Sequence, residues 1–199
     1  MAGFAIRIEH GDFKGVKISD GFKGEGSRIT TSFNRCVLFN VLTNKLGVDF
    51  NGLNCADFCC GSGIVGFEML SMGAHSCVFV DSDRKKVQNV KNVLQKTQFN
   101  GLAECAFLPN LPIFHDKLDV IFFDPPYENN FCERTLMNVV NSGILADNGL
   151  IIVETKKPIT ENFVNTLQLK TVCVKDLKNG AKFFIFEKNL KYHSLILVI

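Results

Sequence analysis

DFCCGSGIVG, at residues 57–66, is the segment from which the architecture of this chain is inferred. It matches G-x-G-x-x-G from Gly61 to Gly66, after a β-prone run and before an apolar, helix-forming run that Gly73 ends. Glycines let the main chain pass close to a nucleotide-like ligand, and N–H groups at a helix start favour its acceptor atoms. The segment therefore predicts a strand, a ligand-binding loop and a helix in succession.

Two aspartates beside this loop narrow the choice of ligand. Asp81 lies 15 residues after Gly66, at the predicted tip of the second strand, where a carboxylate can accept hydrogen bonds from both ribose hydroxyls. Asp57, in the first strand, can meet a cationic amino group, which S-adenosylmethionine carries and NAD lacks. The loop alone also matches a dinucleotide oxidoreductase, so Asp57 is the residue that favours S-adenosylmethionine as cofactor.

The regions around this unit alternate between strand and helix patterns. An almost continuous apolar run at 119–123 predicts a central strand buried on both faces. Alternation of this kind is typical of a parallel sheet covered by helices. The other predicted strands are 54–58, 77–80 and 150–154, and the predicted helices are 31–46, 64–72 and 83–97.

Both ends of the chain depart from that alternation. Residues 4–18 predict a β-hairpin, and residues 171–174 and 183–187 flank a Lys-Asn-Gly turn, so they should pair antiparallel. We therefore predict an α/β fold with a mostly parallel seven-stranded sheet and a C-terminal antiparallel hairpin, as in Rossmann-like class I methyltransferases. The predicted domains are an N-terminal hairpin and helix extension at 1–48, a main domain at 49–190 and a tail of unknown role at 191–199.

The tetrad Asp124-Pro125-Pro126-Tyr127 directly follows the predicted buried strand, at the edge where open α/β folds bind ligands. Two prolines also terminate strands, but that explains neither the acid nor the aromatic residue. The Asp124 carboxylate and the Pro125 carbonyl can accept hydrogen bonds from an exocyclic amine, Pro126 stiffens the turn, and Tyr127 can stack on the base. The tetrad predicts amino methylation of a nucleobase, which requires no metal.

Composition limits the possible partners and compartment. The net charge of +2 excludes a strongly basic nucleic-acid coat, so RNA contact must come from a local patch. The eight cysteines lack the paired spacing of a zinc site. The first residues contain no apolar run long enough for a secretory leader, and no run is long enough to span a membrane. We expect a monomer in the reducing cytoplasm.

The motifs together resemble the RsmD family, bacterial methyltransferases of guanine N2 in small-subunit (16S) ribosomal RNA, over residues 6 to about 187. The opening is similar to the family's IRI-x-x-G-x-x-x-G-x-x-I, and the glycine segment is similar to F-A-G-S-G-x-x-G-x-E-A-L-S-x-G-A. The chain departs from the family at Ile29, Ser32, Phe33 and Asn110. The residues that carry the likeness are Ile6, Gly11, Gly15, Ile18, Arg28, Thr30, Thr31, Arg35, Leu38, Phe39, Asn40, Leu42, Phe58–Gly63, Gly66, Glu68, Leu70, Ser71, Gly73, Ala74, Asp124–Tyr127, Leu145 and Ile152–Glu154.

The resemblance implies a role for each matching position. S-adenosylmethionine is expected against the glycine loop, with an amide where many members have an acid near the adenine. RNA is expected beside the site, on the segment before and within the first helix. The implied cofactor residues are Asp57, Cys59, Gly61, Ser62, Gly63, Asp81, Ser82 and Asn110, and the implied RNA residues are Arg28, Thr31 and Arg35.

Three other functions remain open. An amino methyltransferase of DNA adenine or cytosine can carry a similar tetrad, although 199 residues leave little room for a target-recognition domain. An NAD-dependent oxidoreductase accounts for the loop and Asp81 but leaves the tetrad without a role. A non-catalytic RNA-binding or assembly factor would be expected to lose Asp124 or the glycines.

Overall fold

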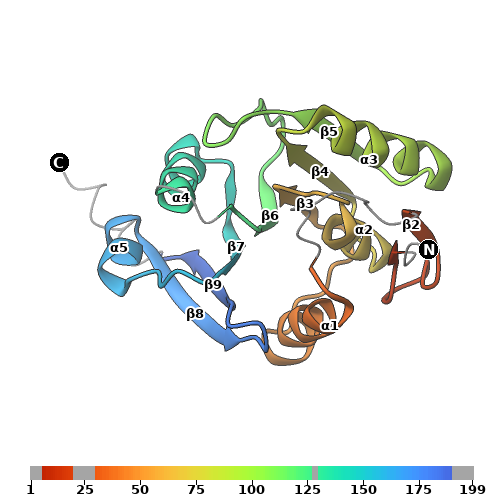
Figure 1. Cartoon of the computed structure of the whole chain (residues 1–199). Helices are drawn as coiled ribbons and strands as arrows, with labels where there is room; N and C mark the ends of the chain where they lie inside the picture. The colour runs from red at the N-terminus through yellow and green to blue at the C-terminus, as the bar shows by residue number, and fades with distance from the viewer. Residues whose placement is uncertain (1–5, 20–29, 127–129, 190–199) are drawn as a thin grey trace. The chain divides into compact units, whose positions relative to one another are not determined.

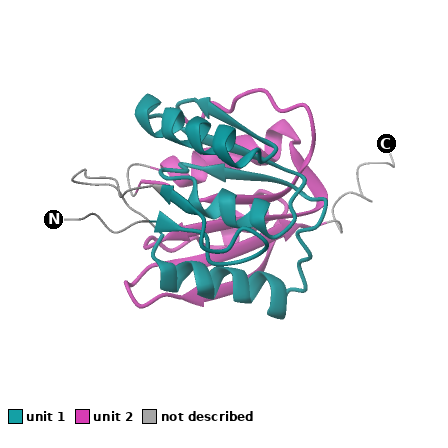
Figure 2. Ribbon diagram, turned by 90° about the vertical axis from the view of Figure 1, so that its right-hand side faces the viewer, with its two compact units in different colours: residues 1–107 teal, residues 108–199 magenta. Residues whose placement is uncertain are grey.

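The computed structural model of this chain describes residues 6–19, 30–126 and 130–189. Their contacts group the chain into two compact units, residues 1–107 and 108–199 (Figure 2). This division differs from the predicted boundaries after residues 48 and 190, which stay predictions. The tail at 191–199 lies outside the described residues.

The first unit contains three parallel strands in the order β5-β4-β3 (Figure 1). Register pairs Asp57 with Phe79 and Asp81 with Cys105, so both aspartates lie at or near the carboxyl ends of their strands. The strands predicted at 54–58 and 77–80 are confirmed as β3 and β4. Strand β5 was not predicted from the sequence. The bounds are β3 Asn54–Phe58, β4 Ser76–Asp81 and β5 Gly101–Cys105.

Two helices of the first unit, α1 and α3, begin at side-chain caps. Thr31 Oγ1 accepts a hydrogen bond from Asn34 N before α1, and Asp83 Oδ1 accepts one from Lys85 N before α3. Helix α1 continues into a π-helical segment, η1, so the helix predicted at 31–46 exists with a change of pitch. The bounds are α1 Ser32–Asn40, η1 Val41–Lys45, α2 Ile64–Ser71 and α3 Arg84–Thr97.

The predicted N-terminal hairpin is present as β1 Ile6–Arg7 and β2 Lys17–Ser19, which pair antiparallel. Its connecting loop is fastened to the end of α2. Asp12 N donates to Ser71 O at 2.9 Å, and Ser71 Oγ donates to His10 O at 2.6 Å. The hairpin therefore belongs to the same packed body as the glycine loop, because α2 begins at that loop.

The second unit contains four strands in the order β6-β7-β9-β8. Strands β6 and β7 are parallel, and β9 runs antiparallel to both β7 and β8, which confirms the predicted C-terminal hairpin. Helices α4 and α5 were not predicted. The bounds are β6 Leu118–Phe123, α4 Phe131–Ser142, β7 Leu145–Thr155, α5 Glu161–Thr166, β8 Leu169–Asp176 and β9 Lys182–Lys188.

Burial in the core explains why β6 and β7 appear in the sequence as apolar runs. In β6 the residues Val120–Phe123 are all buried, as are Ile151–Val153 in β7. The predicted α/β class, with a seven-stranded, mostly parallel sheet that ends in antiparallel strands, is confirmed.

Candidate functional site

The loop between β3 and α2 is held by main-chain hydrogen bonds. Cys60 N donates to Val80 O at 3.0 Å, and Gly63 N donates to Cys60 O at 2.7 Å. Gly63 caps α2 with a φ of +75°, in the left-handed region that favours glycine. Cys59 shares that region at +57°, a strained conformation for a residue with a Cβ. The chain thus turns sharply where the loop meets the helix.

The last glycine of the motif allows α2 to approach β4. A Cβ at Gly66 would lie 2.3 Å from Cε1 of Phe79 and 2.9 Å from Sγ of Cys77. Only a residue without a side chain fits there unless the strand moves. The third glycine therefore sets the helix-to-strand distance, which in turn fixes where the first turn of α2 lies.

Asp81 is a buried carboxylate at the carboxyl end of β4, and 7% of its side chain is exposed. Gly61 N donates to its Oδ2 at 2.9 Å and Asp83 N donates to its Oδ1 at 2.9 Å, while Lys86 Nζ lies 3.9 Å from Oδ2. An ionised carboxylate has about four acceptor sites, so Asp81 still has capacity for two hydroxyl donors. These remaining acceptor sites fit the two ribose hydroxyls of S-adenosylmethionine.

Asp57 has a partner within the protein. It is 2% exposed, and its Oδ2 accepts a hydrogen bond from Gly66 N at 2.9 Å. The carboxylate thereby satisfies one of the N–H groups that every helix leaves without a partner in its first turn. Asp57 therefore positions the loop, and its predicted contact with an ammonium group stays a prediction.

Ser62 and Ser82 differ in their surroundings. Ser62 is buried, and its Oγ accepts a hydrogen bond from Ile64 N at 3.4 Å. Ser82 is exposed just after β4, and its carbonyl accepts from the Cys105 thiol at 3.5 Å. Both serines border the loop region that the sequence singled out, and their contacts with a cofactor remain predictions.

The end of β5 adds residues that sequence reasoning missed. Ala106 N donates to Asp81 O at 3.1 Å, and the next residue, Phe107, has an aromatic side chain that is 71% exposed. An exposed aromatic ring two residues beyond the end of β5 offers a flat apolar face that suits an adenine. Asn110, in contrast, is exposed and belongs to the second unit, so its predicted adenine contact stays a prediction.

Replacing Asp81 by alanine is expected to weaken S-adenosylmethionine binding by about 100-fold, because two charge-assisted hydrogen bonds to hydroxyls are lost. Isothermal titration of the cofactor into the variant measures the change. Asp83→Ala is the matched control: this exposed acid caps α3, so its loss should cost about 1 kcal/mol of stability and leave cofactor affinity unchanged. Unchanged affinity in Asp81→Ala would contradict the ribose assignment.

Cys60, in the loop between β3 and α2, is not a reactive group. Burial raises the pKa of the Cys60 thiol well above its usual range, and the neighbouring Asp57 and Asp81 carboxylates raise it further. A neutral thiol neither attacks a substrate nor binds a metal readily. Cys60 is therefore a small apolar residue of the loop.

The second unit carries the tetrad at the carboxyl end of β6. Asp124 is half-buried, Pro125 is buried and Pro126 is exposed. The strand before them is buried through Phe123, so the turn has a rigid base. Tyr127 lies outside the described residues, and its stacking role stays a prediction.

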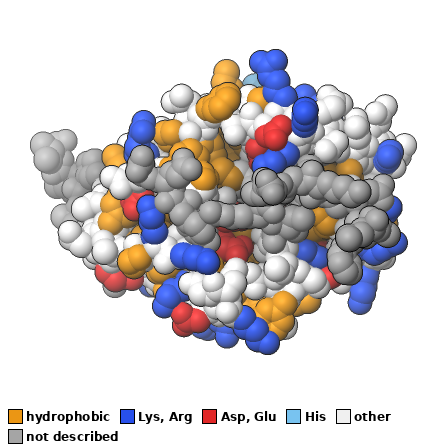
Figure 3. All heavy atoms as spheres, viewed as in Figure 1, with side chains coloured by type: hydrophobic (Ala, Val, Ile, Leu, Met, Phe, Trp, Pro, Cys, Tyr) orange, Lys and Arg blue, Asp and Glu red, His pale blue; other side chains and the backbone are white. Residues whose placement is uncertain are grey.

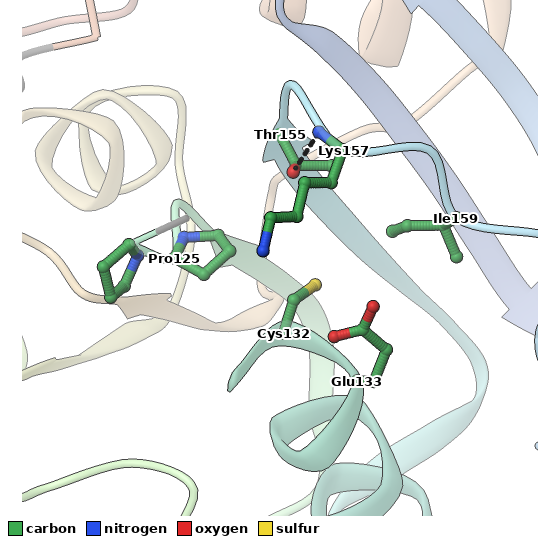
Figure 4. A pocket seen from close by; sticks show the side chains of 7 residues that line it. Pro125, Cys132, Glu133, Thr155, Lys157 and Ile159 are labelled. Carbon is green, nitrogen blue, oxygen red and sulfur yellow. Dashed lines mark hydrogen bonds between the residues drawn. The ribbon is translucent and has the colours of Figure 1, made fainter. Parts of the chain in front are cut away.

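A hollow beside the two prolines, which we call the acceptor pocket, lies wholly within the second unit. It is bounded by the turn after β6, the start of α4 and the segment after β7. Figure 4 shows Lys157 extended toward Pro125 and Cys132, with the Glu133 carboxylate near the thiol. The acceptor pocket consists of Pro125, Pro126, Cys132, Glu133, Thr155, Lys157 and Ile159.

The thiol in the acceptor pocket stays protonated. Burial raises the pKa of Cys132 to about 12, the Glu133 carboxylate adds to the increase, and Lys157 opposes it. A thiol with this pKa is a poor nucleophile at neutral pH. Cys132 therefore lines the pocket without taking part in covalent chemistry.

Arg35 is a buried side chain of α1. Its side chain is 4% exposed; Nε lies 3.2 Å from Glu68 Oε1 and NH1 donates to Thr30 O at 2.8 Å. A buried guanidinium with these partners has a structural role, and the expected RNA contact of Arg35 stays a prediction. Thr31 is exposed while capping α1, and Arg28 lies outside the described residues.

Glu68 is the acceptor at the centre of this network and was not singled out by its chemistry in the sequence. It is fully buried, and it accepts hydrogen bonds from Glu9 N at 2.9 Å and from His10 N at 2.8 Å. His10 Nδ1 is 3.0 Å from its second oxygen. Glu68 thus joins the N-terminal hairpin and α1 to α2, the helix that follows the glycine loop.

The surface carries charges of both signs. On the face in Figure 3, lysine and arginine side chains are spread out, with acidic side chains among them. Within the described ranges, no group of three or more His, Cys, Asp or Glu side chains could hold a metal ion. In the same part of the chain, no helix is long and apolar enough to cross a membrane.

Similar solved structures define the class of fold. The chain matches the Escherichia coli protein yhhF with a TM-score of 0.75 and 24% identity, over 93% of this chain and 98% of that one. It matches a T. thermophilus 16S rRNA N2 methyltransferase, solved with AdoMet and guanosine, with a TM-score of 0.63 and 17% identity, over 82% and 44% of the two chains. The fold is that of class I methyltransferases.

The sequence comparisons define the family. A family profile described as "Conserved hypothetical protein 95" matches residues 6–186, and the chain belongs to this family. The Escherichia coli ribosomal RNA small subunit methyltransferase D is 32% identical over 156 residues, which cover 76% of this chain and 75% of that protein. The resemblance to the RsmD family inferred from the motifs is thereby confirmed.

Proposed function

We propose that this protein transfers a methyl group from S-adenosylmethionine to the exocyclic N2 of a guanine in small-subunit (16S) ribosomal RNA. The observation that carries the proposal is Asp124-Pro125-Pro126 at the carboxyl end of a buried parallel strand. The relatives named as small-subunit ribosomal RNA methyltransferases support the choice of RNA. The tetrad itself supports an amine as the acceptor.

The first unit would hold the cofactor. The Asp81 carboxylate would accept the ribose hydroxyls, the loop from Gly61 to Gly63 would pass along the ligand, and Asp57 would keep the loop and α2 in place. S-adenosylmethionine, when bound, supplies a methyl group on a positively charged sulfur. No metal is needed, because that methyl group is already activated.

The second unit would hold the acceptor. An exocyclic amine is a poor nucleophile, since its lone pair is delocalised into the ring. The Asp124 carboxylate and the Pro125 carbonyl would accept hydrogen bonds from its two N–H groups and pull the nitrogen toward tetrahedral geometry, which localises the lone pair on nitrogen. The fixed φ angles of Pro125 and Pro126 hold that carbonyl in position before the substrate arrives.

Positioning accounts for most of the expected rate increase. Holding two reactants in line can lower a barrier by about 7–11 kcal/mol. After methylation the nitrogen is cationic, and Asp124 or water would take its proton.

Methyl acceptance from labelled S-adenosylmethionine tests the proposal directly. The substrates are a 16S RNA transcript, small subunits from cells that lack the enzyme, and duplex DNA, with nucleoside mass spectrometry of each product. We expect N2-methylguanosine in one or both RNA arms and no label in DNA. Label on adenine or cytosine, or in DNA alone, would overturn the proposal.

A further inference from the structure

The acceptor pocket contains a cation to which the proposed reaction has so far given no role. Lys157 lies two residues beyond the end of β7, and its main-chain N donates to Thr155 Oγ1 at 3.1 Å (Figure 4). This bond anchors the start of the side chain, which then extends toward Pro125 and Cys132. The ammonium group is thereby brought to the turn that carries the proposed amine acceptors.

The ammonium group is available for a ligand. Among residues 6–19, 30–126 and 130–189, no hydrogen bond or ion pair occupies Lys157 Nζ. The side chain is exposed to solvent. An ammonium group has three donors and no acceptor, so a ligand atom beside it must be an acceptor.

The walls of the pocket favour a base edge over a phosphate group. Pro125, Pro126 and Ile159 offer apolar surface, and Cys132 is a neutral thiol. The carboxylate of Glu133 also lines the pocket, and it would repel a phosphate. A planar, uncharged base with an acceptor at one edge is therefore the better match to this lining.

Guanine presents such an acceptor. When its N2 amine is held at Asp124 and Pro125, the carbonyl oxygen O6 lies farther along the same edge, beyond N1–H. Lysine donating to O6 or N7 is among the commonest specific contacts to guanine in nucleic-acid complexes. Adenine has an amine donor in place of O6, which would meet the ammonium group with like polarity.

We propose that Lys157 is a specificity-determining residue that donates a hydrogen bond to O6 of the target guanine. This inference rests on the proposed function and deepens it, because it names the contact that selects guanine among bases with an amine. Lys157 acts on the base rather than on the transferred methyl group. Its loss should therefore lower both the rate and the preference for guanine.

A comparison of two RNAs tests the contact. The wild-type enzyme first identifies the methylated nucleotide in 16S RNA by mass spectrometry. That nucleotide is then replaced by 2-aminopurine, which keeps the N2 amine but lacks O6, in a ligated RNA. Both RNAs are assayed with the wild-type enzyme, Lys157→Met, Lys157→Arg and the control Lys156→Met, which removes a neighbouring exposed lysine that does not line the pocket.

On the guanine RNA, Lys157→Met should lower kcat/KM by about 5- to 100-fold, Lys157→Arg should recover part of it, and Lys156→Met should match the wild type. On the 2-aminopurine RNA, Lys157→Met should cause no further loss. An equal loss on both RNAs would indicate a phosphate contact and overturn the inference, as would a wild-type rate. If the wild-type enzyme makes no N2-methylguanosine, the proposed function itself fails, and this first arm shows it independently of the variants.

Discussion

Replacing Asp124 by alanine is expected to lower kcat by about 1000-fold and to leave S-adenosylmethionine affinity unchanged. The carboxylate belongs to the acceptor side of the proposed reaction, where it would hold the amine, and it or water would take the amine's proton. Single-turnover methylation of 16S RNA measures the rate, and calorimetry measures cofactor binding. The two readouts separate a role in holding the amine from a general loss of folding.

Two further variants sharpen this test. Asp124→Asn keeps one acceptor oxygen, so its rate should fall between those of the wild type and Asp124→Ala. Asp116→Ala removes an exposed acid of the same unit and should retain the wild-type rate. An equal loss of cofactor affinity and rate in Asp124→Ala would refute the acceptor role.

Glu68→Gln is expected to lower the free energy of unfolding by about 3–5 kcal/mol. The change removes the buried one of the two carboxylates that pair with Arg35 and leaves only Glu9, and it turns an amide NH2 toward main-chain donors of Glu9 and His10. Urea denaturation followed by circular dichroism measures the change. Because Glu68 lies in α2, cofactor binding should also weaken as the hairpin loosens.

The pairing of Glu68 and Arg35 can be isolated by a double-mutant cycle. Arg35→Met combined with Glu68→Gln should cost less than the sum of the two single changes, by about 0.5–3 kcal/mol. Glu104→Gln, in β5 of the same unit, should change stability by about 0.5 kcal/mol or less. A Glu68→Gln variant as stable as the wild type would show that the network contributes nothing to folding.

Local patterns identified the elements that surround the glycine loop. Strand β3, helix α2, strand β4 and helix α3 follow from a short apolar run, a glycine turn and a stripe of Val87, Val90 and Leu94, all signals that act within a few residues. The C-terminal hairpin followed from its turn residues. Such signals are independent of the rest of the fold, because they reflect backbone geometry and the burial of one face.

Three elements, β5, α4 and α5, were not predicted from the sequence, and the reason can be identified for each. In β5, GLAEC buries only Ala103 and carries an exposed leucine, so no alternation is visible. Helix α4 begins without a side-chain cap, although Gly143 ends it in the left-handed region as C-terminal glycines do. Helix α5 is short, but Thr160 Oγ1 accepts a hydrogen bond from Phe163 N, a capping signal that could have revealed it.

The candidate site likewise combines features that follow from the local sequence with features that depend on the tertiary structure. The places of the glycine loop, of Asp81 and of the Asp-Pro-Pro turn at the ends of strands could be inferred from residue type and spacing, because glycines and prolines mark where strands end. The roles of Asp57 and Arg35 could not: whether an acid or a guanidinium faces a ligand or the protein depends on what packs against it. Arg35 meets a partner 33 residues away, and only the folded chain brings the two together. Burial and long-range pairing, which are properties of the tertiary structure, therefore decided which charged residues stabilise the fold and which remain available to bind a substrate.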